Sequence, residues 1–229
     1  MDTIYTDGTY LRNNPAWHQD DSPWKARQIA KLLERNGVSP RSIAEVGCGA
    51  GEILRELSRE YPQARCVGYE ISPEAYEICR RKGSGTVSYK LGDIAEDSTT
   101  YDVAMAIDVF EHVEDYFAFL RRIRPCATHK VFHIPLELSV RNVIAGKPLL
   151  DARRSVGHIH HFSRETALAA LHDTGYAILD EFYTSGRTEL PNLSWRSKLL
   201  KWPRKAAYLV SADMAVRVLG GYSLMVLAK

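Results

Sequence analysis

Short apolar runs alternate with amphipathic helical segments along most of this chain, and this alternation constrains the fold more than any other feature. Helical patterns such as GEILRELSREY, SPEAYEICRRK and FEHVEDYFAFLRRI (110–123) separate the runs. Strands separated by helices form βαβ units, so the sequence predicts a doubly wound α/β fold with a mainly parallel sheet. The expected strands cover residues 42–46, 65–70, 86–90, 101–107, 130–135, 176–183 and 222–228.

Three further segments have their own patterns. Ser22 is expected to cap a helix that has Pro23 at its first position and ends near Gly37. Residues 136–162 have the character of a long loop. A capped helix is predicted to run from Ser163 to Thr174, with Gly175 closing it.

Composition narrows the class of protein. The chain has 229 residues, 45% of them hydrophobic, and a net charge of +2, so no global charge draws it to nucleic acid or a membrane. Its four cysteines are far apart and form neither a disulfide framework nor a zinc ribbon. The polar start resembles no secretory signal, and no apolar run approaches the ~18 residues of a membrane span. We therefore expect a cytoplasmic, reduced protein.

The stretch AEVGCGAGE (44–52) places glycines at every second position directly after the first predicted strand. Without Cβ atoms, Gly47, Gly49 and Gly51 permit a tight turn and a close approach of a ligand to the backbone. The helix that follows presents N–H groups and a partial positive charge. Glu70, which ends the next strand, is placed to accept both hydroxyls of a ribose.

Two details of this stretch argue against NAD as the ligand. The spacing is G-x-G-x-G, whereas the dinucleotide motif is G-x-G-x-x-G. Glu45 and Glu52 also add negative charge around the turn, which favours a cationic ligand over a pyrophosphate.

Four motifs in this order resemble the class I S-adenosylmethionine-dependent methyltransferases. They are AEVGCGAGE, GYE (68–70), LGDI (91–94) and YDVAMAIDVFEHV (101–113). The resemblance is close from about Ala44 to Lys130 and continues in outline over the rest. It implies a three-layer, Rossmann-like sheet of seven strands in the order 3-2-1-4-5-7-6. The last strand, 222–228, would be antiparallel.

The resemblance also implies which residues would bind S-adenosylmethionine and its product, S-adenosylhomocysteine. Gly47, Cys48, Gly49 and Gly51 belong to the turn that would line the methionine and ribose portion. Glu45 would help to hold the methionine amino group.

Residues on the next strands would complete the cofactor site. Glu70 would bind the ribose, and Ile71 would pack on the adenine. Asp93 and Ile94 would flank the base, with Asp93 meeting the adenine amino group. Asp108 would face the cofactor near the sulfonium.

We predict a single methyltransferase domain over residues 1–229. An N-terminal lid segment and helix would occupy residues 1–40, and a cofactor-binding half residues 41–135. The acceptor-side half, 136–229, would contain insertions at 136–162 and 187–220.

Histidines are the candidate catalytic residues, because methyl transfer from a sulfonium needs an aligned acceptor and, in some cases, a base. His112 follows the fourth strand and suits a base near neutral pH, although a bond to backbone or to Glu111 would also explain it. His158 and His160 share one face if GHIHHF is extended, and either could serve the acceptor site or belong to a polar loop. No carboxylate cluster is spaced near them, so we expect no metal site.

Two regions outside the motifs have open interpretations. Positive charges in the 136–162 segment suit a phosphorylated or carboxylated acceptor or are solvated surface: Arg141, Lys147, Arg153 and Arg154. The aromatic N-terminal segment either closes over the cofactor or packs on the sheet edge: Tyr5, Tyr10 and Trp17.

The segment 195–205 is basic, and Trp195, Leu199 and Trp202 fall on one helical face. Packing on the core or a homodimer contact is the first interpretation. Peripheral membrane contact and nucleic-acid binding are the alternatives.

The function we predict is methyl transfer to a small or carrier-linked acceptor, most simply at oxygen. The acceptor would be a sugar, a lipid-linked molecule or a secondary-metabolite intermediate. RNA or protein methylation is an alternative, although no RNA-stacking motif is present and no nucleic-acid partner is expected. A non-catalytic, cofactor-binding regulator is the third interpretation.

Overall fold

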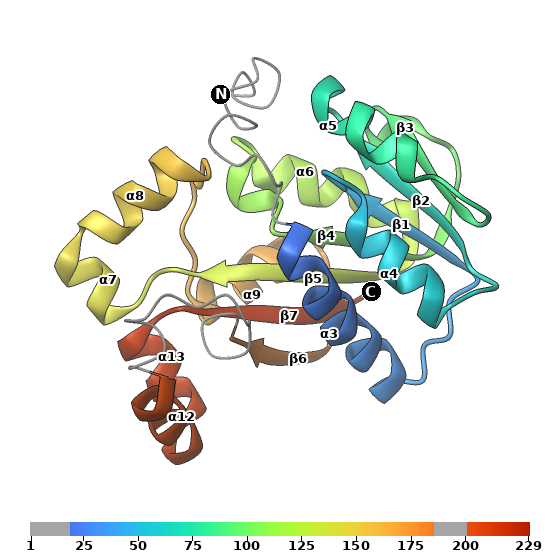
Figure 1. The fold of residues 1–229 in the computed structure, drawn as a ribbon. Helices are drawn as coiled ribbons and strands as arrows, with labels where there is room; N and C mark the ends of the chain where they lie inside the picture. The colour runs from blue at the N-terminus through green and yellow to red at the C-terminus, as the bar shows by residue number, and fades with distance from the viewer. Residues whose placement is uncertain (1–18, 186–200) are drawn as a thin grey trace.

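The computed structural model describes residues 19–185 and 201–229, and one seven-stranded sheet runs through it (Figure 1). The strand order is β3-β2-β1-β4-β5-β7-β6, and β7 is antiparallel to both of its neighbours. The predicted α/β fold, strand order and antiparallel last strand are therefore confirmed. The strands are β1 (Ser42–Val46), β2 (Arg65–Glu70), β3 (Val87–Leu91), β4 (Tyr101–Ile107), β5 (Ala127–Leu136), β6 (Ile178–Thr184) and β7 (Tyr222–Ala228).

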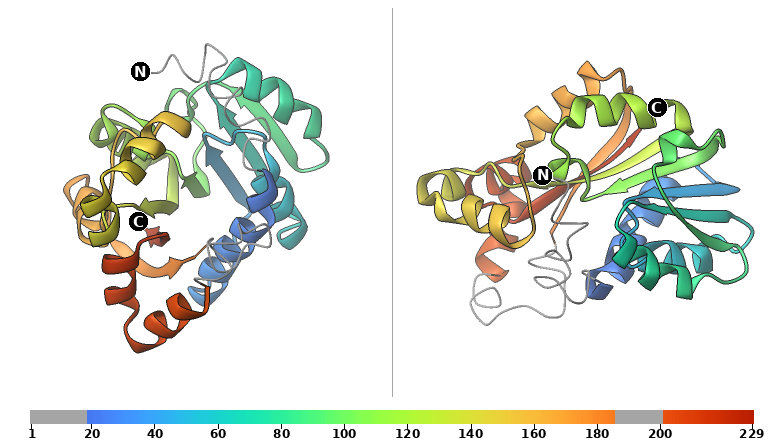
Figure 2. Two further views of the ribbon diagram at one scale, coloured as in Figure 1. Left: turned by 60° about the vertical axis from the view of Figure 1, so that its left-hand side comes forward. Right: turned by 90° about the horizontal axis from the view of Figure 1, so that it is seen from above.

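Helices cover both faces of the sheet and complete the three layers (Figure 2). Each face has its own buried apolar cluster. One face packs against α3 (Ser22–Arg35), α4 (Glu52–Glu60) and α5 (Pro73–Cys79). The other packs against α6 (Tyr116–Ile123), α9 (Arg164–Asp173) and α13 (Ala212–Leu219).

Helix α3 shows how the sequence pattern produces this packing. Ala26, Ile29 and Leu33 recur at helical spacing, and all three are buried against the sheet. Burial of an Ile or Leu side chain stabilises the fold by roughly 1.5–3 kcal/mol. Helix α3 thus lies across the sheet next to α4, with its first turn near the carboxyl ends of the strands (Figure 1).

The prediction of a long loop over 136–162 is wrong in its middle part. Two short helices lie there, α7 (Val140–Ala145) and α8 (Lys147–Ser155). The side chain of Ser139 caps α7, and Gly146, at φ 63°, separates the two helices. Both helices leave apolar side chains exposed, among them Val143 and Ile144, so no buried stripe marks them in the sequence.

Two helix starts also differ from the prediction. Asp21, not Ser22, holds the N-cap position of α3, and Ser22 is the first helical residue. The side chain of Asp21 accepts no capping hydrogen bond from the helix. The helix expected around 110–123 is broken, because η4 (Phe110–His112) is a separate turn and Asp115 caps α6 through the N–H of Ala118. This break leaves Glu111 and His112 at the end of the sheet.

The remaining described elements are short or lie near the end of the chain. They are η1 (Gln19–Asp21), η2 (Arg80–Lys82), η3 (Ile94–Glu96), η5 (Arg124–Cys126) and α12 (Lys201–Val210). The predicted lid residues Tyr5, Tyr10 and Trp17 lie outside the described residues, as do Trp195 and Leu199. Across residues 19–185 and 201–229, no helix has both the length and the apolar character needed to cross a membrane.

Candidate active site

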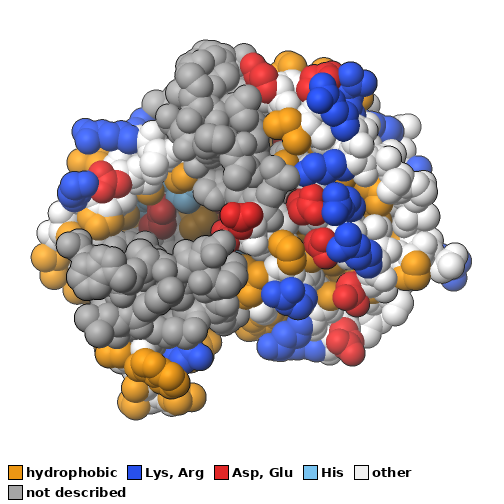
Figure 3. Space-filling model, viewed as in Figure 1, with side chains coloured by type: hydrophobic (Ala, Val, Ile, Leu, Met, Phe, Trp, Pro, Cys, Tyr) orange, Lys and Arg blue, Asp and Glu red, His pale blue; other side chains and the backbone are white. Residues whose placement is uncertain are grey.

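A cavity of about 400 Å³ lies at the carboxyl ends of β1, β2 and β4. This is the edge at which doubly wound sheets bind ligands, and the volume lies within the ~300–1,000 Å³ typical of small-molecule sites. Acidic side chains and a histidine are visible in the hollow on this face (Figure 3). The carboxylates in the lining are those of Asp21, Glu45, Glu52, Glu70 and Asp108.

The glycine turn forms one wall of the cavity. Gly47, Gly49 and Gly51 all have positive φ, at 65°, 52° and 76°, which side chains with a Cβ rarely adopt. A Cβ on Gly51 would also lie 2.5 Å from the ring of Tyr89, whose hydroxyl donates to the carbonyl of Gly51. The turn therefore needs glycine for its own geometry, and it presents bare backbone to the cavity.

Two buried carboxylates flank this turn. Glu45 lies beside the cavity and is only 2% exposed, and its Oε2 has no hydrogen-bond partner. Burial raises the pKa of Glu45 to about 8. Glu70 accepts the N–H of Gly49 at Oε2 and the N–H of Ser72 at Oε1, both at 2.8 Å, while burial raises its pKa. A cation placed in the cavity would meet a carboxylate with an unused oxygen.

Asp108 is the centre of a buried charge network opposite the glycine turn. Lys25 of α3 lies 2.7 Å from its Oδ2, and His133 Nδ1 of β5 lies 2.6 Å from its Oδ1. His133 Nε2 in turn contacts Thr184 Oγ1 of β6 at 2.8 Å. Burial alone would raise the pKa of Asp108, but His133 and Lys25 hold it below its usual range.

Among the described residues, Asp108 is the one non-glycine with positive φ, at 55°. Asp and Asn adopt this conformation more readily than other residues, because a short polar side chain can bond locally. The conformation at the end of β4 turns the carboxylate toward Lys25 and His133. The network thereby fixes α3 against the carboxyl edge of the sheet.

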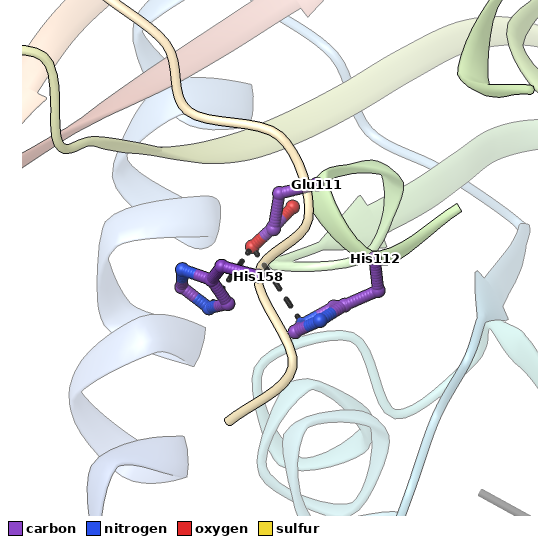
Figure 4. A group of neighbouring side chains, drawn as sticks. All are labelled: Glu111, His112 and His158. Atoms are coloured by element: carbon purple, nitrogen blue, oxygen red, sulfur yellow. Dashed lines mark ion pairs between the residues drawn. The ribbon is translucent and has the colours of Figure 1, made fainter. Parts of the chain in front are cut away.

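A second polar cluster lies deeper on the acceptor side. Glu111 is 1% exposed, and neither of its carboxylate oxygens has a hydrogen-bond partner. Burial raises the pKa of Glu111 well above its usual range. Burial also lowers the pKa of His112 to about 4, with His158 adding to the effect. Figure 4 shows the Glu111 carboxylate between the imidazoles of His112 and His158.

Most of the sequence-predicted site residues line the cavity. From the cofactor set these are Glu45, Gly47, Cys48, Gly49, Gly51, Glu70, Ile71 and Asp108, and from the catalytic set His112 and His158.

The structure brings three predicted site residues to other places. Asp93 accepts the N–H of Ala95 and a bond from Arg122, both at 2.8 Å, and Ile94 is fully buried in the core. His160 points to the carbonyl of Glu114 at 3.2 Å and contacts the ring of Tyr116. The cavity lining includes none of these three residues.

The basic residues of the segment 136–162 also lie away from the cavity. Arg141, Lys147, Arg153 and Arg154 are exposed on α7 and α8, and none of them is among the lining residues. Lys147 pairs with Asp151 at 2.5 Å on the surface of α8.

Sequence reasoning missed several residues that shape the site. Lys25 has no local signal, because it is one charged residue on an amphipathic helix. His133 did have a signal in the sequence. It is a polar residue inside an apolar strand, and buried polar groups need partners. Glu111 was already a candidate partner of His112 in the sequence, but its proximity to His158 and the role of Glu137 appear only in the fold.

Comparison with known proteins agrees with this geometry. The profile of a family described as "Methyltransferase domain" matches residues 16–181, which include the glycine turn, both carboxylates flanking it and the histidine cluster. The chain belongs to this family. The resemblance expected from the four motifs is thereby confirmed.

Relatives in the family carry out methylation of different small molecules, according to their names. Trans-aconitate 2-methyltransferase of Mycolicibacterium gilvum is 24% identical over 173 residues, which cover 72% of this chain and 66% of the relative. The mitochondrial ubiquinone biosynthesis O-methyltransferase of Schizosaccharomyces pombe is 29% identical over 104 residues, or 40% of this chain. That match spans 37% of the relative's length, and the match to norajmaline N-methyltransferase of Rauvolfia serpentina spans 36%.

Solved structures share the fold at lower identity. Magnesium protoporphyrin IX methyltransferase from Synechocystis with bound SAH superposes with a TM-score of 0.60 at 17% identity, covering 95% of this chain and 85% of that chain. Coclaurine N-methyltransferase gives a TM-score of 0.58 at 18% identity, with coverage of 89% and 71%.

Proposed function

We propose that this chain is an S-adenosylmethionine-dependent methyltransferase that acts on a small or carrier-linked acceptor, with oxygen as the acceptor atom. The observation that carries the proposal is the acidic cavity beside the glycine turn in a member of the methyltransferase-domain family. S-adenosylmethionine is a cation with an ammonium group, and the unpartnered Oε2 of Glu45 is a buried acceptor that suits such a group. The residues present therefore fit this cofactor.

Each part of the proposed cofactor site has a physical task. Backbone at Gly47, Gly49 and Gly51 would lie against the methionine and ribose portions, since no Cβ intervenes. Glu70 would accept from the ribose hydroxyls, because each of its oxygens has spare lone-pair capacity beyond one backbone N–H. Asp108 remains a proposed neighbour of the sulfonium, and its network with Lys25 holds it ionised.

The reaction would be an in-line displacement. The acceptor oxygen forms a bond to the methyl carbon while the carbon–sulfur bond breaks and its electron pair stays on sulfur. The acceptor proton leaves, so an O–H acceptor yields the O-methyl product, S-adenosylhomocysteine and one proton. His112 and His158 line the cavity and are the proposed groups that assist removal of this proton, whereas His160 lies outside the cavity.

Oxygen is favoured over nitrogen as the acceptor atom because of these histidines. A hydroxyl or carboxylic acid must lose a proton to become a good nucleophile, and a cavity with two imidazoles can assist that loss. Relatives named for O-methylation and for N-methylation both occur, so the acceptor itself stays a proposal. The open interpretations of sugar, lipid-linked and secondary-metabolite acceptors all fit a cavity of this kind.

The proposed cellular setting rests on different features. We infer a reducing, cytoplasmic compartment, because all four cysteines are buried and free. For the segment 195–205, a homodimer contact and a membrane surface stay alternatives. In its described part, Trp202 is 75% exposed, which suits either contact.

Calorimetric titration with S-adenosylmethionine, S-adenosylhomocysteine and NADH tests the proposal. We expect micromolar binding of the first two and none of NADH. Glu70→Ala should weaken binding by about tenfold or more, since hydrogen bonds to a charged group contribute about 1.5–3 kcal/mol. Glu77→Ala is the matched control, because Glu77 forms only an exposed pair with Arg80. Binding of NADH alone would overturn the proposal.

A turnover assay then tests the histidines. In a screen of hydroxyl and carboxylate acceptors, His112→Ala and His158→Ala should lower turnover much more than cofactor affinity. His160→Ala should change neither, because this side chain lies outside the cavity. Full turnover in both of the first two variants would assign the reaction to alignment alone.

A further inference from the structure

Glu111 presents an unusual chemical situation. Its side chain is 1% exposed, yet both oxygens lack a hydrogen-bond partner. A buried ionised carboxylate without partners is strongly unfavourable, so native proteins pair such a group, keep it protonated or use it to bind a cation. His112 Nε2 and His158 Nε2 each lie 4.0 Å from its Oε1 (Figure 4).

The other ring nitrogen of each histidine fixes which nitrogen faces Glu111. His112 Nδ1 lies 3.1 Å from the carbonyl oxygen of Gly157, which can only accept, so Nδ1 carries the hydrogen. His158 Nδ1 lies 2.9 Å from Oε1 of Glu137 and donates in the same way. In each neutral ring the lone pair is then on Nε2, on the side of Glu111. Metal-binding histidines in proteins are oriented by the same kind of bond.

The backbone holds these groups together although they are distant in sequence. The N–H groups of Ile159 and His160 both donate to the carbonyl of Glu111 at 3.0 Å. Oε2 of Glu137 also accepts a hydrogen bond from Nδ1 of a second histidine, His161, at 2.5 Å. This bond fixes the carboxylate that orients His158. The loop after α8 is thus tied to the η4 turn.

We propose that Glu111, His112 and His158 bind one divalent transition-metal cation, with Zn²⁺ as the best match. One ligand atom from each of these residues lies within 4.8 Å of the others. Two imidazoles and a carboxylate form a ligand set typical of zinc sites that keep one position open, whereas Mg²⁺ and Ca²⁺ prefer oxygen ligands. No metal site was expected from the sequence, because the carboxylate that completes it comes from another element.

The present spacing needs a modest contraction. In a tetrahedral shell with bonds of about 2.0–2.2 Å, neighbouring ligand atoms lie roughly 3.3–3.6 Å apart. Rotation of the three side chains by less than about 1 Å each at their ends reaches this spacing. The backbone ties can therefore stay in place.

The position of the site gives the cation a task. His112 and His158 line the cavity, so the fourth coordination position would face the space left for the acceptor. A zinc ion there would bind the acceptor oxygen and lower the pKa of its proton. This role rests on the proposed function, in which the two imidazoles would then assist proton loss as ligands of the metal. Binding of the metal does not rest on it, since it needs no methyl donor.

The test uses untagged full-length protein treated with a chelator and then titrated with Zn²⁺ by calorimetry. We expect one equivalent bound with micromolar or tighter affinity. Glu111→Gln and His158→Ala should each weaken binding at least tenfold, and Glu137→Gln should weaken it about 10–100-fold, the range for loss of an orienting partner. His160→Ala is the matched control and should bind as the unmodified protein does.

Co²⁺ absorption of the unmodified protein supplies a measurement that does not depend on variants. Intense visible bands of a four-coordinate ion, without a thiolate charge-transfer band, support the site and exclude the cysteines as ligands. Absence of Zn²⁺ binding, or equal binding in Glu111→Gln and His158→Ala, would overturn the inference. Zinc binding without any binding of S-adenosylmethionine would instead refute the proposed function and leave the metal site standing.

Discussion

The two sides of the cavity are built in different ways. The cofactor side comes from one short stretch of chain, residues 45–71, whose backbone and two carboxylates form most of the cavity wall there. The opposite side is assembled from side chains of many elements. It combines Lys25 of α3, Asp108 and His112 after β4, His133 of β5 and His158 after α8.

This difference has a physical origin. A turn that must approach a ligand closely needs particular backbone angles, and glycine at fixed spacing is the chemical means to reach them. Side chains that must meet a variable acceptor can come from any element that ends near the cavity. A local pattern therefore identifies the donor side. On the other side the sequence indicates candidates such as His112, but the partners that orient them become visible only in the folded chain.

The largest effect is expected where the glycine turn is tightest. Gly51→Ala should destabilise the fold by about 2–5 kcal/mol, because positive φ costs about 1–2 kcal/mol and overpacking against Tyr89 about 1–3 kcal/mol. Gly85→Ala is the matched control: its φ is 56°, but no heavy atom lies within 4 Å of the added Cβ. It should lose only the first term. Urea unfolding of both variants measures the difference, and equal losses would contradict the packing argument.

Across the cavity, Lys25→Met should destabilise the protein by about 1–3 kcal/mol. Loss of a partner from a buried pair typically costs 3–5 kcal/mol, and this value is reduced here because the side chains are 14% and 23% exposed and His133 remains with Asp108. Lys147→Met removes an i,i+4 pair that is 79% and 51% exposed, so at most about 0.5 kcal/mol should be lost. Thermal melts of both variants give the comparison. Equal effects would mean that the Asp108 network is no stronger than a surface pair.

The same contrast explains how much the sequence revealed. Strands β1, β2, β4 and β7 fall on the predicted residues, because each is a short apolar run bounded by turn residues. Helices α7 and α8 were missed since Ile144 and Leu150 are exposed, and an amphipathic pattern exists only where one face is buried.

Within the site, the residues that could be predicted from the sequence are those that belong to local motifs. Gly47, Gly49 and Gly51 and the carboxylates Glu45 and Glu70 could be placed because strand ends of a parallel sheet meet at one edge. His158 was a candidate because it shares one extended face with His160, whereas the structure positions it through its contact with Glu137 and its place beside Glu111. Such contacts depend on how the loop after α8 returns to η4, which no spacing in the sequence encodes.

A smaller effect on the cofactor side is a proton released on binding. Glu45 is protonated at pH 7, since burial raises its pKa to about 8. An ammonium group beside it favours the ionised form and lowers that pKa, so the carboxyl should lose its proton when S-adenosylmethionine binds. Calorimetry at pH 7 in two buffers of different ionisation enthalpy should show close to one proton released per site. Glu45→Gln should release none, and unchanged release in that variant would remove Glu45 from the amino-group site.

The smallest effect is expected at Asp93, which lies at the border of the cofactor side. Its carboxylate already accepts from Ala95 and Arg122, yet the resemblance assigns it to the adenine amino group. One partly exposed hydrogen bond contributes about 0.5–1.5 kcal/mol, so Asp93→Ala should weaken cofactor binding roughly two- to tenfold. Arg122→Ala should change the affinity less than about threefold, because Arg122 is 54% exposed and Asp93 keeps its oxygens. If Asp93→Ala binds as well as Arg122→Ala, the cofactor side ends at Ile71, and Asp93 serves only to cap η3.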